Sequence, residues 1–121
     1  KEPQNVNFAE PFGFLDYCKL QQNSRIVISD SGTISEESAI LGFRAVTTRD
    51  SMERPEALEA GSITMTGLEA KSILRGVQLA LEKKPSTNLP EGYDTRSFSD
   101  NVLNFVFSTV GLAGKWKGLN E

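Results

Sequence analysis

The chain has 121 residues and a net charge of −3, with 38% hydrophobic and 24% charged residues, which is the composition of one ordinary globular domain. It has no basic run with interleaved aromatic residues, which argues against nucleic-acid binding, and no apolar stretch approaches the ~20 residues that span a bilayer. Cys18 is the only cysteine and histidine is absent, so an internal disulfide is excluded and the commonest general base and transition-metal ligand are missing.

From these features we expect a cytoplasmic protein with neither a metal ion nor a cofactor, because the sequence also lacks a signal-peptide pattern. Cys18 is expected to be half-buried on a helix, as a packing residue. The opening Lys1-Glu2-Pro3 has no initiator methionine. We interpret this as an excised piece or a processed chain.

The hydrophobic spacing predicts helices that alternate with short strands. After an irregular entry over residues 1–14, a short helix is expected over 15–24. A continuous β-branched run predicts a strand over 25–29 that is buried on both faces, as in a parallel sheet. A second buried strand is expected over 45–48 and a third strand over 62–65. Between and after them, helices are expected over 33–41, 55–61 and 66–81. A last helix over 98–110 has apolar residues along one face, and the glycine-rich tail after residue 111 is expected to fray.

Alternating strands and helices indicate an α/β fold, Rossmann-like, with three αβα layers around a parallel sheet. Three strands make an unusually narrow sheet, so we interpret residues 1–84 as a partial domain whose front is missing. Residues 85–96 are rich in Pro, Ser, Thr and Gly and are expected to be a loop or linker. Residues 97–121 form the C-terminal long helix and tail, whose unpartnered apolar face makes a homodimer possible.

Three local signals set the expected helix ends. Thr33 with Glu36 fits a capping box, in which each side chain bonds to a backbone N–H of the first turn. Thr66 with Glu69 fits a second one. Gly42 is expected to end the helix before it in a left-handed conformation.

The loop from Asp30 to Thr33 follows a buried strand and opens a helix, where ligands bind in open α/β sheets. Gly32 allows close backbone approach, and the free N–H groups of the helix suit phosphate. The hydroxyls of Ser31 and Thr33 add donors, although an ordinary N-cap explains the same residues. Glu37 has the position of a carboxylate that accepts bonds from ribose hydroxyls, or of a charge that merely favours the helix dipole.

Two further candidates lie outside this loop. Arg54 follows the second strand, so it is expected at the same sheet edge, where its planar fork of donors suits a diphosphate. The alternative is a solvated loop with local ion pairs. Tyr17 is either a ring near a nucleotide base or an aromatic residue at the edge of the core.

Together these segments resemble the non-hydrolysing UDP-N-acetylglucosamine 2-epimerases, over residues 11 to about 83. The matching motif reads roughly S-D-S-G-G-x-x-E-E, then L-G, then R-D-x-x-E-R-P-E-A-x-x-A-G. In this chain it corresponds to residues 29–37, 41–42 and 49–61. The resemblance implies a GT-B-like parent of two Rossmann-like domains, with a UDP-N-acetylhexosamine in the cleft between them.

The resemblance also implies residue roles. Ser31, Gly32 and Thr33 would hold the diphosphate, Glu37 the ribose and Arg54 the phosphates, with Tyr17 near the uracil. The family inverts C2 of the sugar by eliminating UDP to a 2-acetamidoglycal and adding it back, with carboxylates and a histidine that lie upstream of the matched segments. We therefore expect no catalytic residue in this chain, weak UDP binding, no epimerisation, and a missing N-terminal domain as its partner.

Two departures from the motif point to a branch of the family. Thr33 replaces the second glycine, and Ser38-Ala39-Ile40 replaces the usual Ala-Pro-Ser. These changes resemble the branch that makes UDP-N-acetyl-L-fucosamine for capsule or O-antigen. Two alternatives stay open: the donor-binding domain of a sugar-nucleotide glycosyltransferase, and a stand-alone, non-catalytic nucleotide-binding or interaction module.

Overall fold

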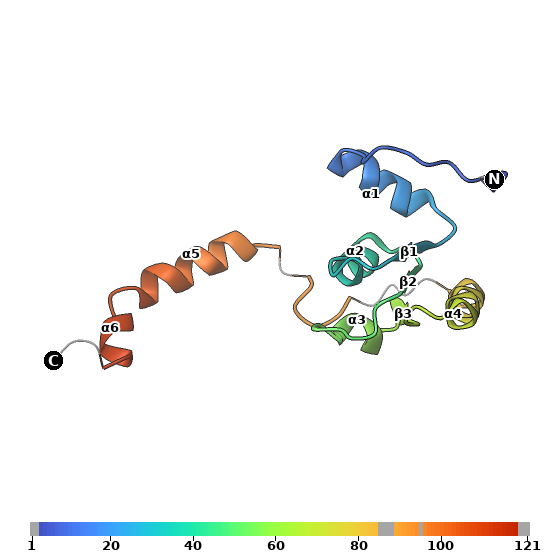
Figure 1. Ribbon diagram of the computed structural model, residues 1–121. Coiled ribbons are helices and arrows are strands. Elements are labelled where there is room, and N and C mark those ends of the chain that lie inside the picture. Colours follow the sequence, from blue (N-terminus) through green and yellow to red (C-terminus); the bar gives the residue numbers. More distant parts are fainter. Residues whose placement is uncertain (1–2, 85–88, 95, 119–121) are drawn as a thin grey trace.

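The computed structural model describes residues 3–84, 89–94 and 96–118, and it confirms the alternation of helices and strands (Figure 1). In chain order the elements are α1 (Phe14–Asn23), β1 (Val27–Ser29), α2 (Ile34–Leu41), β2 (Ala45–Thr47), α3 (Glu56–Glu59), β3 (Ile63–Met65), α4 (Ala70–Glu82), α5 (Phe98–Thr109) and α6 (Ala113–Trp116). The strands are shorter than predicted by one or two residues. The expected α/β, Rossmann-like class is therefore observed.

The three strands form one parallel sheet in the order β1-β2-β3. All three residues of the central strand β2 are buried. Ile28 in the edge strand β1 is 50% exposed, so the prediction that β1 is buried on both faces is wrong. The reason is that, among the described elements, helices cover only part of the sheet: α4 lies on one face, and α2 and α3 on the other (Figure 1).

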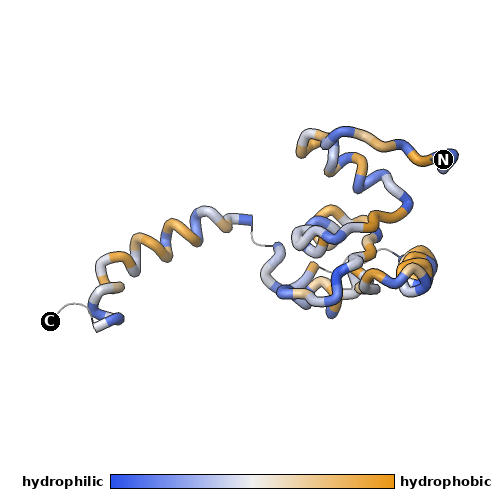
Figure 2. The backbone as a smooth tube through the Cα atoms, viewed as in Figure 1, coloured by the Kyte–Doolittle hydropathy of each residue, from blue (hydrophilic) through white to orange (hydrophobic). Residues whose placement is uncertain are grey.

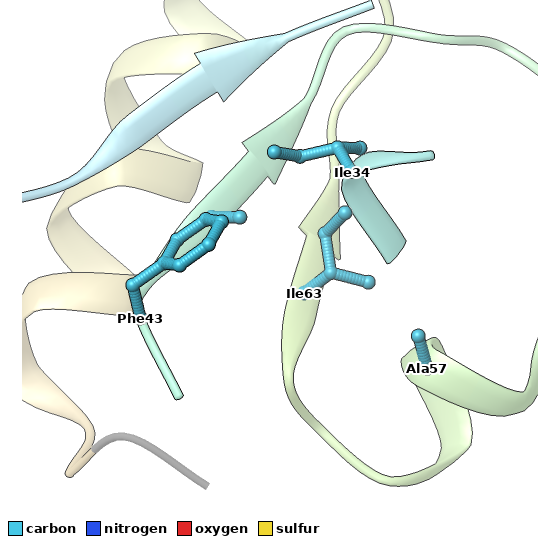
Figure 3. Close-up of a cluster of buried hydrophobic side chains, with 5 residues drawn as sticks. Ile34, Phe43, Ala57 and Ile63 are labelled. Carbon is cyan, nitrogen blue, oxygen red and sulfur yellow. The ribbon is translucent and has the colours of Figure 1, made fainter. Parts of the chain in front are cut away.

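The main hydrophobic core lies between the sheet and the α2–α3 layer (Figure 3). Its buried side chains come from α2, α3, the strands β2 and β3, and the loop that leads into β2. They are Ile34, Phe43, Ala45, Ala57 and Ile63. Ile34 is fully buried at the first turn of α2. This packing holds α2 against the strands β2 and β3 and against α3.

On the opposite face, α4 approaches the sheet closely at Gly76. A β-carbon at this position would collide with Thr66 Cγ2 and lie 3.7 Å from Val46 Cγ1. The apolar side chains of α4 are only partly buried, since Leu74 remains exposed. The small residues Gly76 and Ala80, rather than the large ones, are the buried contacts of this helix.

Both predicted capping boxes are wrong. Thr33 has a helical backbone conformation and makes no capping hydrogen bond; its hydroxyl donates to Glu37 Oε1 instead. Glu36 pairs with Arg54 and does not reach back along the helix. Partners distant in sequence or on the next turn outcompete the local backbone for these side chains.

The second box fails for a similar reason. Helix α4 begins at Ala70 and Glu69 makes no capping bond, while the hydroxyl of Thr66 donates to the carbonyl of Thr47 at 3.2 Å. The left-handed stop at Gly42 is confirmed, with φ of 73°. Positive φ is accessible to glycine without the steric penalty that other residues carry.

The helices α5 and α6 extend away from the sheet (Figure 1), and no residue of α5 is buried. Apolar residues recur along α5, where orange segments alternate with pale and blue ones in Figure 2. Residues 113–116 form α6 where a frayed tail was expected; residues 119–121 lie outside the described part of the chain. Among the described residues, no helix is long and apolar enough to cross a membrane.

Candidate functional site

Two arginines from the loop after β2 lie close to Gly32, which is in the loop between β1 and α2. A β-carbon on Gly32 would lie 3.1 Å from Arg49 Nη1 and 3.7 Å from Arg54 Nη2. Arg54 Nη2 also donates to the Gly32 carbonyl at 3.2 Å. The loop after β2 therefore lies at the same sheet edge as residues 30–33, as predicted, and places positive charge beside the amino end of α2.

The hydroxyls of this loop are tied to one another. Ser31 Oγ and Thr33 Oγ1 lie 2.9 Å apart, and the Thr33 N–H donates to Ser31 Oγ at 3.3 Å. The Ser31 N–H in turn donates to Ser29 Oγ at 3.0 Å. These bonds hold an exposed loop in one conformation, so its polar groups are oriented in advance.

Glu37 is held at both carboxylate oxygens. Thr33 Oγ1 donates to Oε1 at 2.7 Å, and Gln21 Nε2 donates to Oε2 at 2.5 Å. Gln21 lies on α1 and is only 3% exposed. The residue was not predicted as a site residue, because a lone glutamine at helical spacing carries no recognisable signal.

Arg54 is fixed by an ion pair with Glu36, with 2.6 Å between Nε and Oε1. The side chain of Arg54 remains 50% exposed, whereas that of Glu36 is 26% exposed. Next to it, Arg49 pairs with Glu53 at 3.3 Å. The local ion pairs expected of this charged loop and the proximity of Arg54 to Gly32 are thus both observed.

Tyr17 lies on α1, one helical turn before Gln21, and is exposed. Both residues line a shallow groove between α1 and β1 that also includes Phe12, Leu20 and Ile28. Gln21, which lines this groove together with Tyr17, donates a hydrogen bond to Glu37 and so connects the groove to the rest of the site. Its position agrees with either sequence interpretation, a base-facing ring or an aromatic residue at the core edge.

A second groove lies between α1 and α2, and its lining combines the polar site residues with apolar side chains from both helices. It is lined by Phe14, Leu15, Cys18, Thr33, Glu36, Glu37, Ile40, Leu41 and Arg54. Cys18 is half-buried there, as predicted. The site residues therefore open onto a surface that also offers apolar contact.

Tyr93 also belongs to this charge cluster, although it was predicted to lie in a linker. Burial raises the pKa of the Tyr93 phenol above its ordinary value of 10.0, and the carboxylates of Glu36 and Glu56 raise it further. The Arg54 guanidinium acts in the opposite direction. Tyr93 lies in a turn in which its N–H donates to the Pro90 carbonyl. The sequence of this turn resembles that of an ordinary loop, so no motif identifies Tyr93.

The arrangement suits the binding of an anion that carries hydroxyl groups. Free N–H groups at the start of α2 and the guanidinium of Arg54 attract an anion, and Glu37 offers a carboxylate to hydroxyl groups. Within residues 3–84, 89–94 and 96–118, no cluster of three or more His, Cys, Asp or Glu side chains has metal-binding geometry.

Comparisons with known proteins agree with this arrangement. The sequence pattern of the family described as UDP-N-acetylglucosamine 2-epimerase matches residues 1–105. The UDP-N-acetylglucosamine 2-epimerase of Methanocaldococcus jannaschii is 33% identical over 92 residues, covering 76% of this chain and 25% of the relative. That of Methanococcus maripaludis is 36% identical over 102 residues, covering 84% and 27%.

Solved structures show the same similarity. A UDP-N-acetylglucosamine 2-epimerase from Rickettsia bellii superposes with a TM-score of 0.82 at 35% identity, covering 90% of this chain and 31% of the other. The M. jannaschii enzyme in complex with UDP-GlcNAc and UDP gives 0.79 at 26% identity, covering 88% and 29%. The chain spans about a quarter of the length of these curated relatives. It belongs to the UDP-N-acetylglucosamine 2-epimerase family.

Proposed function

We propose that this chain binds the UDP part of a UDP-N-acetylhexosamine, as the nucleotide-binding part of a 2-epimerase that inverts C2 of the sugar. The observation that supports this most is the placement of Arg54 on the Gly32 carbonyl at the amino end of α2. A relative of the same fold is known in complex with UDP-GlcNAc and UDP. The family match favours an epimerase over a glycosyltransferase domain or a non-catalytic module.

The proposed contacts follow the polarity of the site. The backbone around Gly32 and the hydroxyls of Ser31 and Thr33 hold the diphosphate together with Arg54. Glu37, already fixed by two donors, accepts bonds from the ribose hydroxyls. Tyr17 lies beside the uracil, in the groove next to Gln21.

The remaining parts of the proposal concern the whole enzyme. The groups that move the proton come from the N-terminal domain of the parent, so this chain alone binds UDP weakly and does not epimerise. Residues 1–84 act as the partial UDP-binding domain, 85–96 as the linker and 97–121 as the C-terminal helix and tail. Thr33 and Ser38-Ala39-Ile40 support the branch that makes UDP-N-acetyl-L-fucosamine for capsule or O-antigen in the cytoplasm.

Ligand-observed NMR on the 121-residue chain tests the proposal with UDP, UDP-GlcNAc and ADP at millimolar concentration. We expect saturation transfer to UDP and UDP-GlcNAc and a weaker signal for ADP. The substitution Arg54→Ala removes a charge-assisted hydrogen bond, so it should weaken UDP binding by about tenfold or more. No 2-epimer should accumulate in the UDP-GlcNAc sample.

Arg25→Ala is the matched control. Arg25 is an exposed arginine just before β1, so it lies near the amino ends of the strands, away from the proposed site at their carboxyl ends. It should bind UDP like the parent. Absence of any UDP contact, or equal UDP binding by the parent and Arg54→Ala, would overturn the proposed site. Formation of the 2-epimer by the isolated chain would contradict the proposed inactivity, and a preference for ADP would favour the glycosyltransferase alternative.

A further inference from the structure

Glu36 differs from the other carboxylates of the site in how it is used. Its Oε1 lies 2.6 Å from Arg54 Nε. Its Oε2 is buried and, among the described residues, has no hydrogen-bond partner. Burying a carboxylate oxygen without a hydrogen-bond partner costs stability. Local stabilisation therefore does not explain a glutamate at position 36.

Arg54 is anchored at two points. The Nε–H points to Glu36 and one Nη2–H to the Gly32 carbonyl. A guanidinium has five N–H donors, so three remain for a ligand after these two bonds. These two bonds hold the guanidinium beside the amino end of α2, while the Arg54 side chain as a whole remains 50% exposed.

We propose that Glu36 is a positioning residue for Arg54: it holds the guanidinium over Gly32 with its free donors directed to the diphosphate. This inference rests on the proposed function. An exposed arginine loses rotamer freedom when it is immobilised by a ligand, and the bond to Glu36 imposes that order before the ligand arrives. The capping role predicted for Glu36 from the sequence is thereby replaced by a contact 18 residues away.

Tyr93, on the segment that leads to α5, lies near the same ion pair. Its hydroxyl is buried and has no hydrogen-bond partner among the described residues, like Glu36 Oε2. The pKa of its phenol responds to both Glu36 and Arg54, which places it within electrostatic range of the two.

The test uses Glu36→Gln, which keeps the shape of the side chain and removes its charge, in the 121-residue chain. UDP affinity, measured by NMR titration, should fall by about three- to tenfold. In the Arg54→Ala background the same substitution should have no further effect, because Glu36 acts through Arg54. The Nε–H signal of Arg54 should shift and broaden in the ligand-free Glu36→Gln protein.

Glu59→Gln is the control, since Glu59 is an exposed carboxylate of α3, and it should bind UDP like the parent. If Glu36→Gln does not fold, Glu36→Asp withdraws the carboxylate from Nε and carries the same expectation. Unchanged affinity overturns the inference, and tighter binding does so too, because Glu36 would then compete with the phosphates. UDP binding that depends on Arg54 but not on Glu36 refutes this inference alone, whereas no UDP contact refutes the proposed function as well.

Discussion

Glu37 joins two helices through one carboxylate. Its oxygens accept from Thr33 on the α2 turn and from Gln21 on α1, so the charge is held by two neutral donors. Charged acceptors form stronger hydrogen bonds than neutral ones. A hydroxyl-bearing ligand at Glu37 must share these bonds or replace them, which limits the affinity that this carboxylate alone contributes.

The buried phenol of Tyr93 gives a prediction that is independent of ligand. The chain has two tyrosines, Tyr17 and Tyr93, so Tyr17→Phe leaves Tyr93 as the only ionisable phenol. Because burial and nearby carboxylates raise its pKa, the absorbance titration of phenolate in this variant should have a midpoint above 10.0. A midpoint at or below 10.0 would contradict the described environment.

The same shift has a consequence for stability. The folded chain binds the phenol proton more tightly than the unfolded chain. The stabilisation is therefore fully present below the pKa of the phenol in the unfolded chain. It is lost as the pH rises through the higher pKa of the phenol in the folded chain. In Tyr93→Phe this part of the alkaline loss should disappear, as measured by thermal unfolding at a series of pH values.

The sequence predicted where in the fold the site residues lie better than it predicted which groups they bond to. The position of Arg54 followed from the rule that parallel strands end at a common edge, which needs only the order of elements. The partner of Glu36 did not follow, because two plausible partners existed: a backbone N–H nearby and a guanidinium brought in by folding. Gln21 and Tyr93 had no signal at all, since each acts through one side chain placed by tertiary structure.

At the scale of elements, the contact between α4 and the sheet depends on the absence of a side chain. Gly76 faces Thr66 and Val46 at a distance that a methyl group cannot fit without movement. Gly76→Ala gains up to about 1 kcal/mol of helix propensity but overpacks the contact, which typically costs about 1–3 kcal/mol. We expect a net loss of roughly 1 kcal/mol or more in urea unfolding.

Gln78→Ala serves as the comparison, because Gln78 is exposed on the same helix. Its effect should stay within about 0.5 kcal/mol. If Gly76→Ala proved more stable than the parent, α4 would have room to move away from the sheet. The periodicity of α4 was readable from the sequence, but the depth at which the helix packs was not, since that depends on Thr66 and Val46 across the interface.

At the scale of the whole molecule, α5 presents apolar side chains to solvent. Its exposed residues include Phe98, Val102, Leu103, Phe105, Val106 and Phe107. Monomeric proteins seldom expose large contiguous apolar patches. We therefore expect the 121-residue chain to associate with increasing concentration, as measured by sedimentation velocity, in line with the homodimer considered from the sequence.

The double substitution Phe98→Ser and Phe105→Ser, two helical turns apart on one face, should reduce this association. Phe107→Ser changes a phenylalanine on the other side of α5 that is more exposed than either of these, and it should have a smaller effect. A parent chain that stays monomeric at all concentrations, or equal effects of the two variants, would show that this face does not drive association.

Helix α2 begins without a side-chain cap, because Thr33 and Glu36 are both engaged elsewhere. The fold thus carries an incomplete helix start at the place where an anion is proposed to bind. Any ligand that settles there binds the native state and not the unfolded chain, so its free energy of binding adds to the stability of the fold. If the proposed nucleotide binds there, the melting temperature of the chain should rise with nucleotide concentration, by an amount set by the ratio of that concentration to the dissociation constant.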